Sequence, residues 1–253
     1  MDIAGFAALL VLSALAAYMQ TLTGFAQGLI MMGGIGLFGL MPLPQAAVLV
    51  SILVLVNAAQ VLAKGWRDIA WREFRPAMMA SVIALIAGYG LLDILLSTAV
   101  EWLKLVLGLV IMASALQLIL KPEALPQRSS TGSFVTFGAI GGLMGGLFST
   151  AGPPLVYHLY RQPLPAVKIR QTLVAIFAIN AVLRLMIVTA SGALPQGDFW
   201  WSLLCVPVVM VATFVAKRWP PPLSQTSMRR IAFCLLLLSG LSLAAYALLK
   251  LAA

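Results

Sequence analysis

Ten continuous apolar runs make up most of this sequence, and short polar connections separate them. The runs cover residues 3–19, 25–41, 46–63, 77–96, 102–120, 134–148, 153–160, 172–191, 199–216 and 231–249. Runs that do not alternate with polar residues predict membrane helices rather than β-barrel strands. Because 62% of the residues are hydrophobic and 9% are charged, one soluble core could not bury them all. At roughly 20 residues per spanning helix, we predict an all-α polytopic membrane protein with about eight to ten membrane segments.

The basic residues are concentrated in a few of the connections. Thirteen of the sixteen lysines and arginines fall in four of them: Lys64, Arg67, Arg72, Arg75, Lys121, Arg128, Arg161, Lys168, Arg170, Lys217, Arg218, Arg229 and Arg230. Positive charge marks the cytoplasmic side of a membrane protein, so we interpret all thirteen as cytoplasmic and both termini as external. The net charge of +9 does not indicate nucleic acid as a partner, because no stretch is both basic and polar.

The chain divides into two halves of similar layout. Residues 121–133 form the longest polar interruption and leave five runs on each side. The segment M-P-L-P-Q-A at 41–46 resembles Q-P-L-P-A-V at 162–167. We predict a first repeat at 1–120, a cytoplasmic linker at 121–133 and a second repeat at 134–253. An odd number of crossings in each half makes these inverted repeats, a layout common in secondary transporters. Each repeat is expected to be a short, possibly re-entrant helical hairpin followed by three transmembrane helices.

Polar residues interrupt both hairpins, at 21–28 and at 149–154. Irregular backbone inside a membrane is tolerated where protein or water covers it, so we expect these tips to line a cavity. Free N–H groups at a helix start favour an anion. We predict a substrate site made of the tips and the helices that follow them: Thr23, Gly24, Gln27, Asn57, Ser149, Thr150, Gly152, Pro153, Asn180 and Arg184.

Each part of this predicted site also has a plainer interpretation. The break at 149–154 could be a surface turn between two helices. Asn57 and Asn180 could be interhelical hydrogen-bonding residues, which are common in membrane bundles. Arg184 could extend to the membrane surface from a position about two turns from the end of its helix. Gly138, Gly142 and Gly146 form a G-xxx-G-xxx-G face that we interpret as helix packing only.

The sequence has little from which to build an enzyme. His158 is the single histidine; it could carry a coupling proton, but we favour a plain hydrogen-bonding role. No carboxylate lies at the centre of an apolar run, and no motif of a hydrolase, metalloprotease or P-loop is present. Cys205 and Cys234 lie in apolar runs as buried thiols. We therefore predict no catalytic residue, no metal, no cofactor and no enzymatic activity.

The motifs T-L-T-G-F-A-Q-G (21–28), P-L-P-Q-A-A (42–47) and G-G-L-M-G-G-L-F-S-T-A-G-P-P-L-V-Y (141–157) resemble those of the sulfite exporter TauE/SafE family. The resemblance covers nearly the whole chain. It implies a bacterial inner-membrane carrier of sulfite, sulfonates or other small organic or sulfur anions, with the hairpin tips as its central site. One departure is that the first tip reads G-F-A-Q-G, where many members have a more glycine-rich string; this leaves the anion open.

From the residues and the resemblance together we predict a multi-pass transporter that exports a small anion between two inverted repeats. Its expected partners are the anionic substrate and the lipid bilayer, and it is a monomer or a homodimer. One alternative is a membrane enzyme acting on a lipid-linked substrate, for which a cluster of His, Asp or Glu near one interface would be needed. Another is a structural subunit, which would not need paired polar helix breaks.

Overall fold

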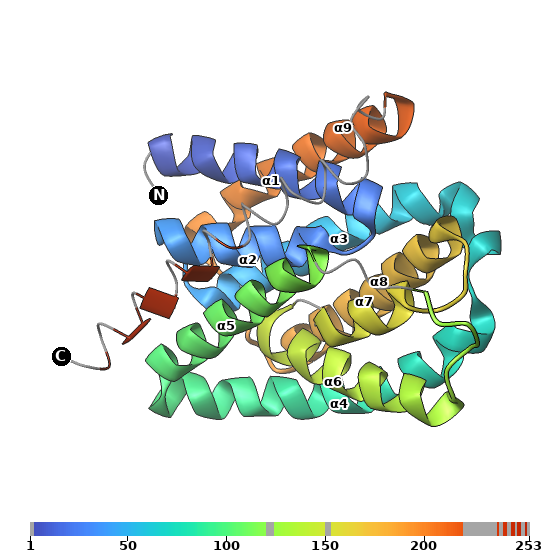
Figure 1. The fold of residues 1–253 in the computed structure, drawn as a ribbon. Coiled ribbons are helices and arrows are strands. Elements are labelled where there is room, and N and C mark those ends of the chain that lie inside the picture. The colour runs from blue at the N-terminus through green and yellow to red at the C-terminus, as the bar shows by residue number, and fades with distance from the viewer. Residues whose placement is uncertain are drawn as a thin grey trace.

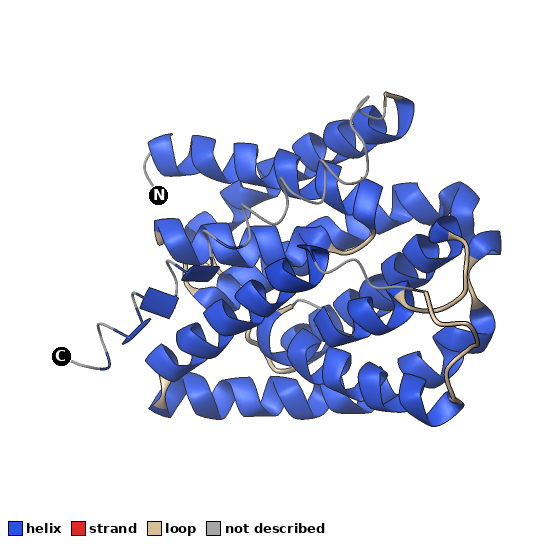
Figure 2. Cartoon of the chain, in the orientation of Figure 1, coloured by secondary structure: helices blue, strands red, loops and turns tan. Residues whose placement is uncertain are grey.

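The computed structural model describes residues 3–119, 124–149 and 153–219, together with isolated positions between 237 and 251. Every regular element in the three long ranges is helical (Figures 1 and 2). The first half contains α1 (Ile3–Thr23), α2 (Ala26–Phe38), α3 (Leu43–Gly65), the short η1 (Trp66–Asp68), α4 (Trp71–Thr98) and α5 (Val100–Ile119). The second half contains α6 (Thr131–Phe148), α7 (Pro153–Tyr160), α8 (Ala166–Ala190), η2 (Gly197–Leu204) and α9 (Cys205–Arg218). The predicted all-helical fold is confirmed.

Six helical segments among the described residues are long and apolar enough to cross a membrane: Ile3–Thr23, Leu43–Asp68, Trp71–Ser97, Thr131–Phe148, Ala166–Ala190 and Gly197–Arg218. In each of the two helical hairpins, α1–α2 and α6–α7, the two arms differ in length. Their first arms, α1 and α6, are long enough to span. The second arms α2 and α7 have 13 and 8 residues, which gives lengths of only about 20 and 12 Å against a hydrocarbon core of about 30 Å.

The two P-L-P motifs start matching helices. Pro42 precedes α3 with φ −58° and ψ 143°, and Pro165 precedes α8 with φ −56° and ψ 140°. A proline before the first turn is favourable, since it lacks the N–H that the helix would leave unpaired and fixes φ near −65°. Asn57 and Asn180 each lie 15 residues after that proline. The two asparagines therefore occupy the same position in their helices.

Three pairs of helices make the most extensive contacts in the bundle. α4 lies against α6, α1 lies against α9, and α3 crosses α8 between them (Figure 1). In the α4–α6 pair, a Cβ added at Gly138, Gly142 or Gly146 would strike the α4 backbone at Ala77, Ser81 and Leu85 respectively. The helices run parallel, because both series of residue numbers rise together. The prediction that these glycines serve packing is confirmed.

The four basic connections meet at one end of the bundle, on the right of Figure 1. Leu125 N–H donates to Arg161 O at 2.7 Å, which joins the 124–130 segment to the end of α7. Lys217 Nζ donates to Gln60 O at 2.7 Å and joins α9 to α3. The described parts of these connections thus lie on one side of the bundle, as the charge pattern predicts. Lys121, Arg229 and Arg230 lie outside the described residues, and the cytoplasmic assignment of this side stays a prediction.

Candidate functional site

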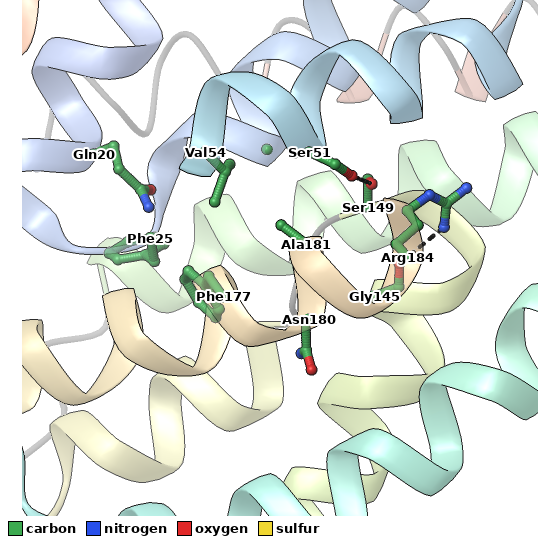
Figure 3. A pocket seen from close by; sticks show the side chains of 11 residues that line it. Gln20, Phe25, Ser51, Val54, Gly145, Ser149, Phe177, Asn180, Ala181 and Arg184 are labelled. Carbon is green, nitrogen blue, oxygen red and sulfur yellow. Dashed lines mark hydrogen bonds between the residues drawn. The ribbon is translucent and has the colours of Figure 1, made fainter. Parts of the chain in front are cut away.

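A pocket lies where the two hairpin breaks approach the crossing of α3 and α8 (Figure 3). Its cavity volume is about 30 Å³, within about 410 Å³ of empty space when the open mouth is counted. The first hairpin contributes Gln20, Phe25 and Gly28, and the second contributes Gly145 and Ser149. The crossing helices supply the other lining residues: Ser51 and Val54 from α3, and Phe177, Asn180, Ala181 and Arg184 from α8.

Arg184 carries the positive charge of this pocket. Its side chain is 2% exposed, and Nη1 donates to Gly145 O at 3.1 Å and to Gly146 O. Those carbonyls belong to the last turn of α6, which carries the negative end of the helix dipole. Gly145 O also accepts the N–H of Ser149, at 3.0 Å. The guanidinium also lies over the ring of Tyr89, 5.5 Å from its centroid. Arg184 therefore points inward to α6 and does not extend to the membrane surface, while its Nε has no hydrogen-bond partner.

Two serine hydroxyls lie beside Arg184 at the second break. Ser149 Oγ and Ser51 Oγ are 2.8 Å apart, and each also lies 2.8 Å from Ala47 O. Ser149 ends α6 with φ 54°, a left-handed conformation that is uncommon for a residue other than glycine. The break thus turns the chain sharply and directs a hydroxyl at α3. Both serines line the pocket, and each hydroxyl is a rotatable donor that is directed at Ala47 O in this structure.

The first break is built around Gly24, whose φ of +87° only glycine adopts freely. Thr23 Oγ1 donates to Met19 O at 2.7 Å, and Tyr160 OH donates to Thr23 O at 2.6 Å. Gln27 is fully buried; its N–H donates to Gln20 Oε1 at 3.1 Å. Neither polar atom of the Gln27 side chain has a partner, nor does Gln20 Nε2. Unpaired buried polar atoms are costly, and this tip holds two amide donors and one amide acceptor without partners.

The two equivalent asparagines have equivalent partners. Asn57 Nδ2 donates at 2.8 Å to Thr213 Oγ1 of α9 and at 2.8 Å to Thr21 Oγ1 of α1. Asn180 Nδ2 donates to Ser81 Oγ of α4 at 2.9 Å. Each asparagine thereby links its helix to a neighbour, as the interhelical interpretation expects. Asn180 lines the pocket as well, whereas Asn57 lies outside its lining.

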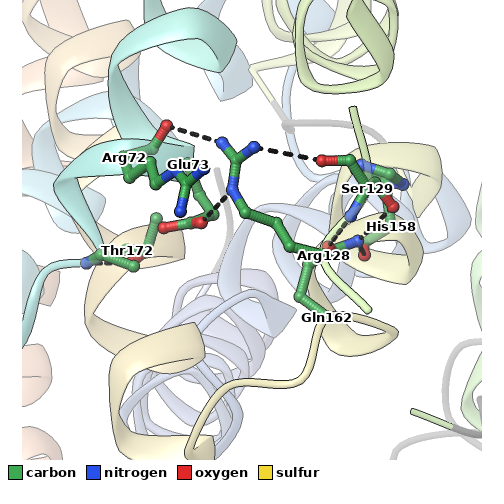
Figure 4. Close-up of polar contacts among 8 residues, drawn as sticks. Arg72, Glu73, Arg128, Ser129, His158, Gln162 and Thr172 are labelled. Atoms are coloured by element: carbon green, nitrogen blue, oxygen red, sulfur yellow. Dashed lines mark hydrogen bonds and ion pairs between the residues drawn. The ribbon is translucent and has the colours of Figure 1, made fainter. Parts of the chain in front are cut away.

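His158 lies away from the pocket, in the polar network at the basic end of the bundle (Figure 4). Its ring stacks on Phe137 with centroids 4.3 Å apart, and Nε2 lies 3.3 Å from Ser133 Oγ. Burial lowers the pKa of His158 from its ordinary value, and the positive charge of Arg161 lowers it further. Gln162 joins His158 to the linker, because its Nε2 donates to His158 O at 2.9 Å and to Ser129 Oγ at 3.0 Å.

The same network contains a shielded ion pair. Arg128 Nε donates to Glu73 Oε1 at 2.6 Å, while Nη2 donates to Arg72 O at 3.1 Å. Glu73 is 5% exposed. These contacts fasten the linker to the first turn of α4, and through Gln162 to the end of α7. A hydrogen-bonding role for His158 fits this position.

The structure brings together part of the predicted site. Ser149, Asn180 and Arg184 line the pocket. Thr23, Gly24 and Gln27 do not line it, but they lie at the hairpin tip whose residues Phe25 and Gly28 do. Thr150 and Gly152 lie outside the described residues, and Pro153 is described only as the start of α7.

Sequence analysis missed Gln20, Ser51, Phe25 and Phe177. Ser51 lies inside an apolar run and Gln20 directly follows one, so the polarity of both residues was a usable signal. The two phenylalanines offered no such signal. Among the described residues, no group of three or more His, Cys, Asp or Glu could hold a metal ion.

Comparison with known proteins gives two matches. The family model described as "Sulfite exporter TauE/SafE" matches residues 9–243. The chain is also 38% identical over 226 residues to a protein of Cupriavidus necator named "Probable sulfite/organosulfonate exporter TauE", an alignment that covers 89% of this chain and 88% of the relative. No solved structure matches the chain.

Proposed function

Because the chain belongs to the sulfite exporter TauE/SafE family, we propose that it is a secondary transporter that exports a small anion from bacteria across the inner membrane. The substrate class is sulfite or an organosulfonate, as the name of the Cupriavidus necator relative suggests, or another small organic acid. The anion binds in the central pocket between two inverted repeats.

One observation carries this proposal: among the described residues that line the pocket, Arg184 alone has a formal charge. A buried guanidinium without a carboxylate partner favours an anion, because transfer of an unpaired charge out of water is costly. Arg184 Nε has no partner, and the hydroxyls of Ser51 and Ser149 lie at the same end of the pocket (Figure 3). Such N–H and O–H donors replace the water around an oxyanion.

The two ends of the pocket differ in chemistry, which favours an anion that carries an apolar part. Arg184 and the serines lie toward one end, while Phe25 and Phe177 lie toward the other (Figure 3). A sulfonate or sulfite group would occupy the polar end, and the aromatic end would accept the carbon chain of an organosulfonate. Gln20, whose Nε2 is unpartnered, adds a donor near Phe25.

The way the helices pair across the two halves of the chain supports the inverted repeats. α1 with α9 corresponds to α6 with α4, and each central helix carries its asparagine 15 residues after its proline. The Asn57–Thr213 contact then corresponds to the Asn180–Ser81 contact. A pocket at the interface of such repeats is where alternating-access carriers place their substrate.

Export needs no coupling carboxylate. An anion that leaves a cell whose interior is negative gains about 2.3 kcal/mol per charge for each 100 mV of membrane potential. The described residues that line the pocket include no Asp or Glu to carry a proton. The membrane potential therefore favours export of the anion without a coupling ion.

The test is titration of purified protein with sulfite, taurine and a short carboxylate by calorimetry. Arg184→Gln removes charge-assisted hydrogen bonds, so affinity should fall about tenfold or more. Arg218→Gln is the matched control, since it removes an exposed charge at the end of α9 and should bind as wild type. Ser51→Ala provides a milder change in the same pocket if Arg184→Gln fails to fold. Wild-type affinity in both folded pocket variants would refute the site.

A further inference from the structure

Arg170, in the first turns of α8, has a position that its membership of a basic cluster does not explain. The tip of the first hairpin lies directly on it: a Cβ at Gly24 would be 3.0 Å from Arg170 Cγ and 3.1 Å from its Cα. Phe25, the next residue, lines the pocket. Arg170 therefore stands one residue beyond the pocket wall, on the side of the basic connections.

The side chain of Arg170 is only partly exposed, and its Nε is enclosed without a hydrogen-bond partner. Neither ion pair found among the described residues includes it; these pairs are Lys104–Glu101 and Arg128–Glu73. An arginine whose charge only marks topology would extend into water, where its donors are satisfied. Arg170 instead keeps an unsatisfied donor against the hairpin tip.

Arg170 and Arg184 also share a face of α8. Phe177 and Ala181 line the pocket with Arg184, and positions 170, 177, 181 and 184 follow the helical spacing of one stripe. The two guanidinium-bearing residues are about 21 Å apart along the axis, from a rise of about 1.5 Å per residue. Lys168 is exposed and lies about 200° around the helix from Arg170.

We propose that Arg170 is a capture site that takes the oxyanion from the cytoplasm before it passes Phe25 into the pocket at Arg184. This inference rests on the proposed function and adds a second anion contact to it. A planar guanidinium binds two oxygens of a sulfite, sulfonate or carboxylate group at once. The nearby start of α2 at Ala26 adds N–H groups and a positive helix end, and the side chain of Gln27 in its first turn is buried without a partner.

The experiment measures initial rates of radiolabelled sulfite uptake in inside-out and right-side-out membrane vesicles. Inside-out vesicles present the cytoplasmic face to the added sulfite. There Arg170→Gln should raise KM about tenfold or more and change the saturated rate little. In right-side-out vesicles, where sulfite enters from the other face, KM should stay at the wild-type value. A structural role would alter both orientations alike, so this asymmetry identifies capture.

Lys168→Gln is the matched control, because it removes the same charge two residues away on the opposite face. Its KM should equal wild type in both orientations. Arg170→Lys keeps the charge and loses the planar fork, so its KM should lie between wild type and Arg170→Gln; it also carries the test if Arg170→Gln does not fold. Equal KM values for Arg170→Gln and Lys168→Gln, or a rise of the same size in both orientations, would overturn the proposal.

Failure of this inference can be distinguished from failure of the proposed function. If Arg184→Gln loses sulfite binding while Arg170→Gln transports normally, the central pocket stands and the capture site is wrong. If wild-type vesicles do not transport sulfite, taurine or a short carboxylate in either orientation, the proposed function is wrong and the capture site falls with it.

Discussion

The contact between α4 and α6 offers a perturbation whose size can be worked from the structure. Gly142 lies against the α4 backbone, and a Cβ there would be 2.6 Å from Ser81 Cα and 2.7 Å from its carbonyl carbon. Carbon atoms pack at about 3.5–4.0 Å. Gly142→Ala must therefore push the helices apart by about 1 Å, because backbone atoms cannot rotate away as a side chain can.

Overpacking of this kind costs about 1–3 kcal/mol. Alanine returns up to about 1 kcal/mol through its higher helix propensity. The rigid backbone on both sides places the cost toward its upper end, so we expect a net loss of about 2 kcal/mol. For a chain of this size, 1 kcal/mol corresponds to about 2–4 °C, which predicts a fall in Tm of about 4–8 °C.

The assay is thermal unfolding of the purified protein in detergent, followed by tryptophan fluorescence. The control is Gly132→Ala in the first turn of the same helix, where an added Cβ meets only Ser130 Oγ, at 4.0 Å. This variant gains propensity without a clash, so its Tm should be unchanged or slightly higher. If Gly142→Ala melts with Gly132→Ala, α4 and α6 are not in backbone contact and the packing is wrong.

Three further predictions concern pH, the second break and orientation. Burial in the folded protein lowers the pKa of His158, so the folded state favours the neutral imidazole and the unfolded chain binds more protons near about pH 6. The contribution of His158 to the free energy of unfolding is therefore greatest above about pH 6.5 and falls as the pH drops through that value. Denaturant titrations of His158→Gln should lack this decline, with transport mostly kept; an unchanged pH profile would contradict the assignment. Ser149→Gly should be about 1 kcal/mol more stable than Ser149→Ala, because both lose the hydroxyl but only glycine relieves φ 54°; equal melting temperatures would argue against the left-handed backbone. Accessibility tags at positions 126 and 222 should label from the cytoplasm and a tag after Ala253 from outside, and an internal C-terminus would refute the inverted topology.

Sequence analysis identified the parts of the site whose chemistry is unusual for a membrane helix. Arg184 and Asn180 stand out in an apolar run, and Ser149 stands at a break before two prolines; all three line the pocket. Asn57 has the same sequence signal and the same place in its helix, yet its amide nitrogen is engaged by α1 and α9. Gln20 and Ser51 were not predicted, because a single polar residue within or directly after an apolar run does not reveal which way it faces.

The sequence by itself determined those features of the protein that depend on the surrounding solvent and on local backbone geometry. The length and apolarity of the runs specify membrane helices, the basic clusters specify one side, and the P-L-P motifs start α3 and α8. Which helices touch was decided only by the tertiary structure. A helix that is apolar all round gives no stripe to mark its buried face, and in lipid the choice of neighbour depends on close packing and a few hydrogen bonds. That is why the meeting of Arg184 with the carbonyls of Gly145 and Gly146 became visible only when α6 and α8 were placed together.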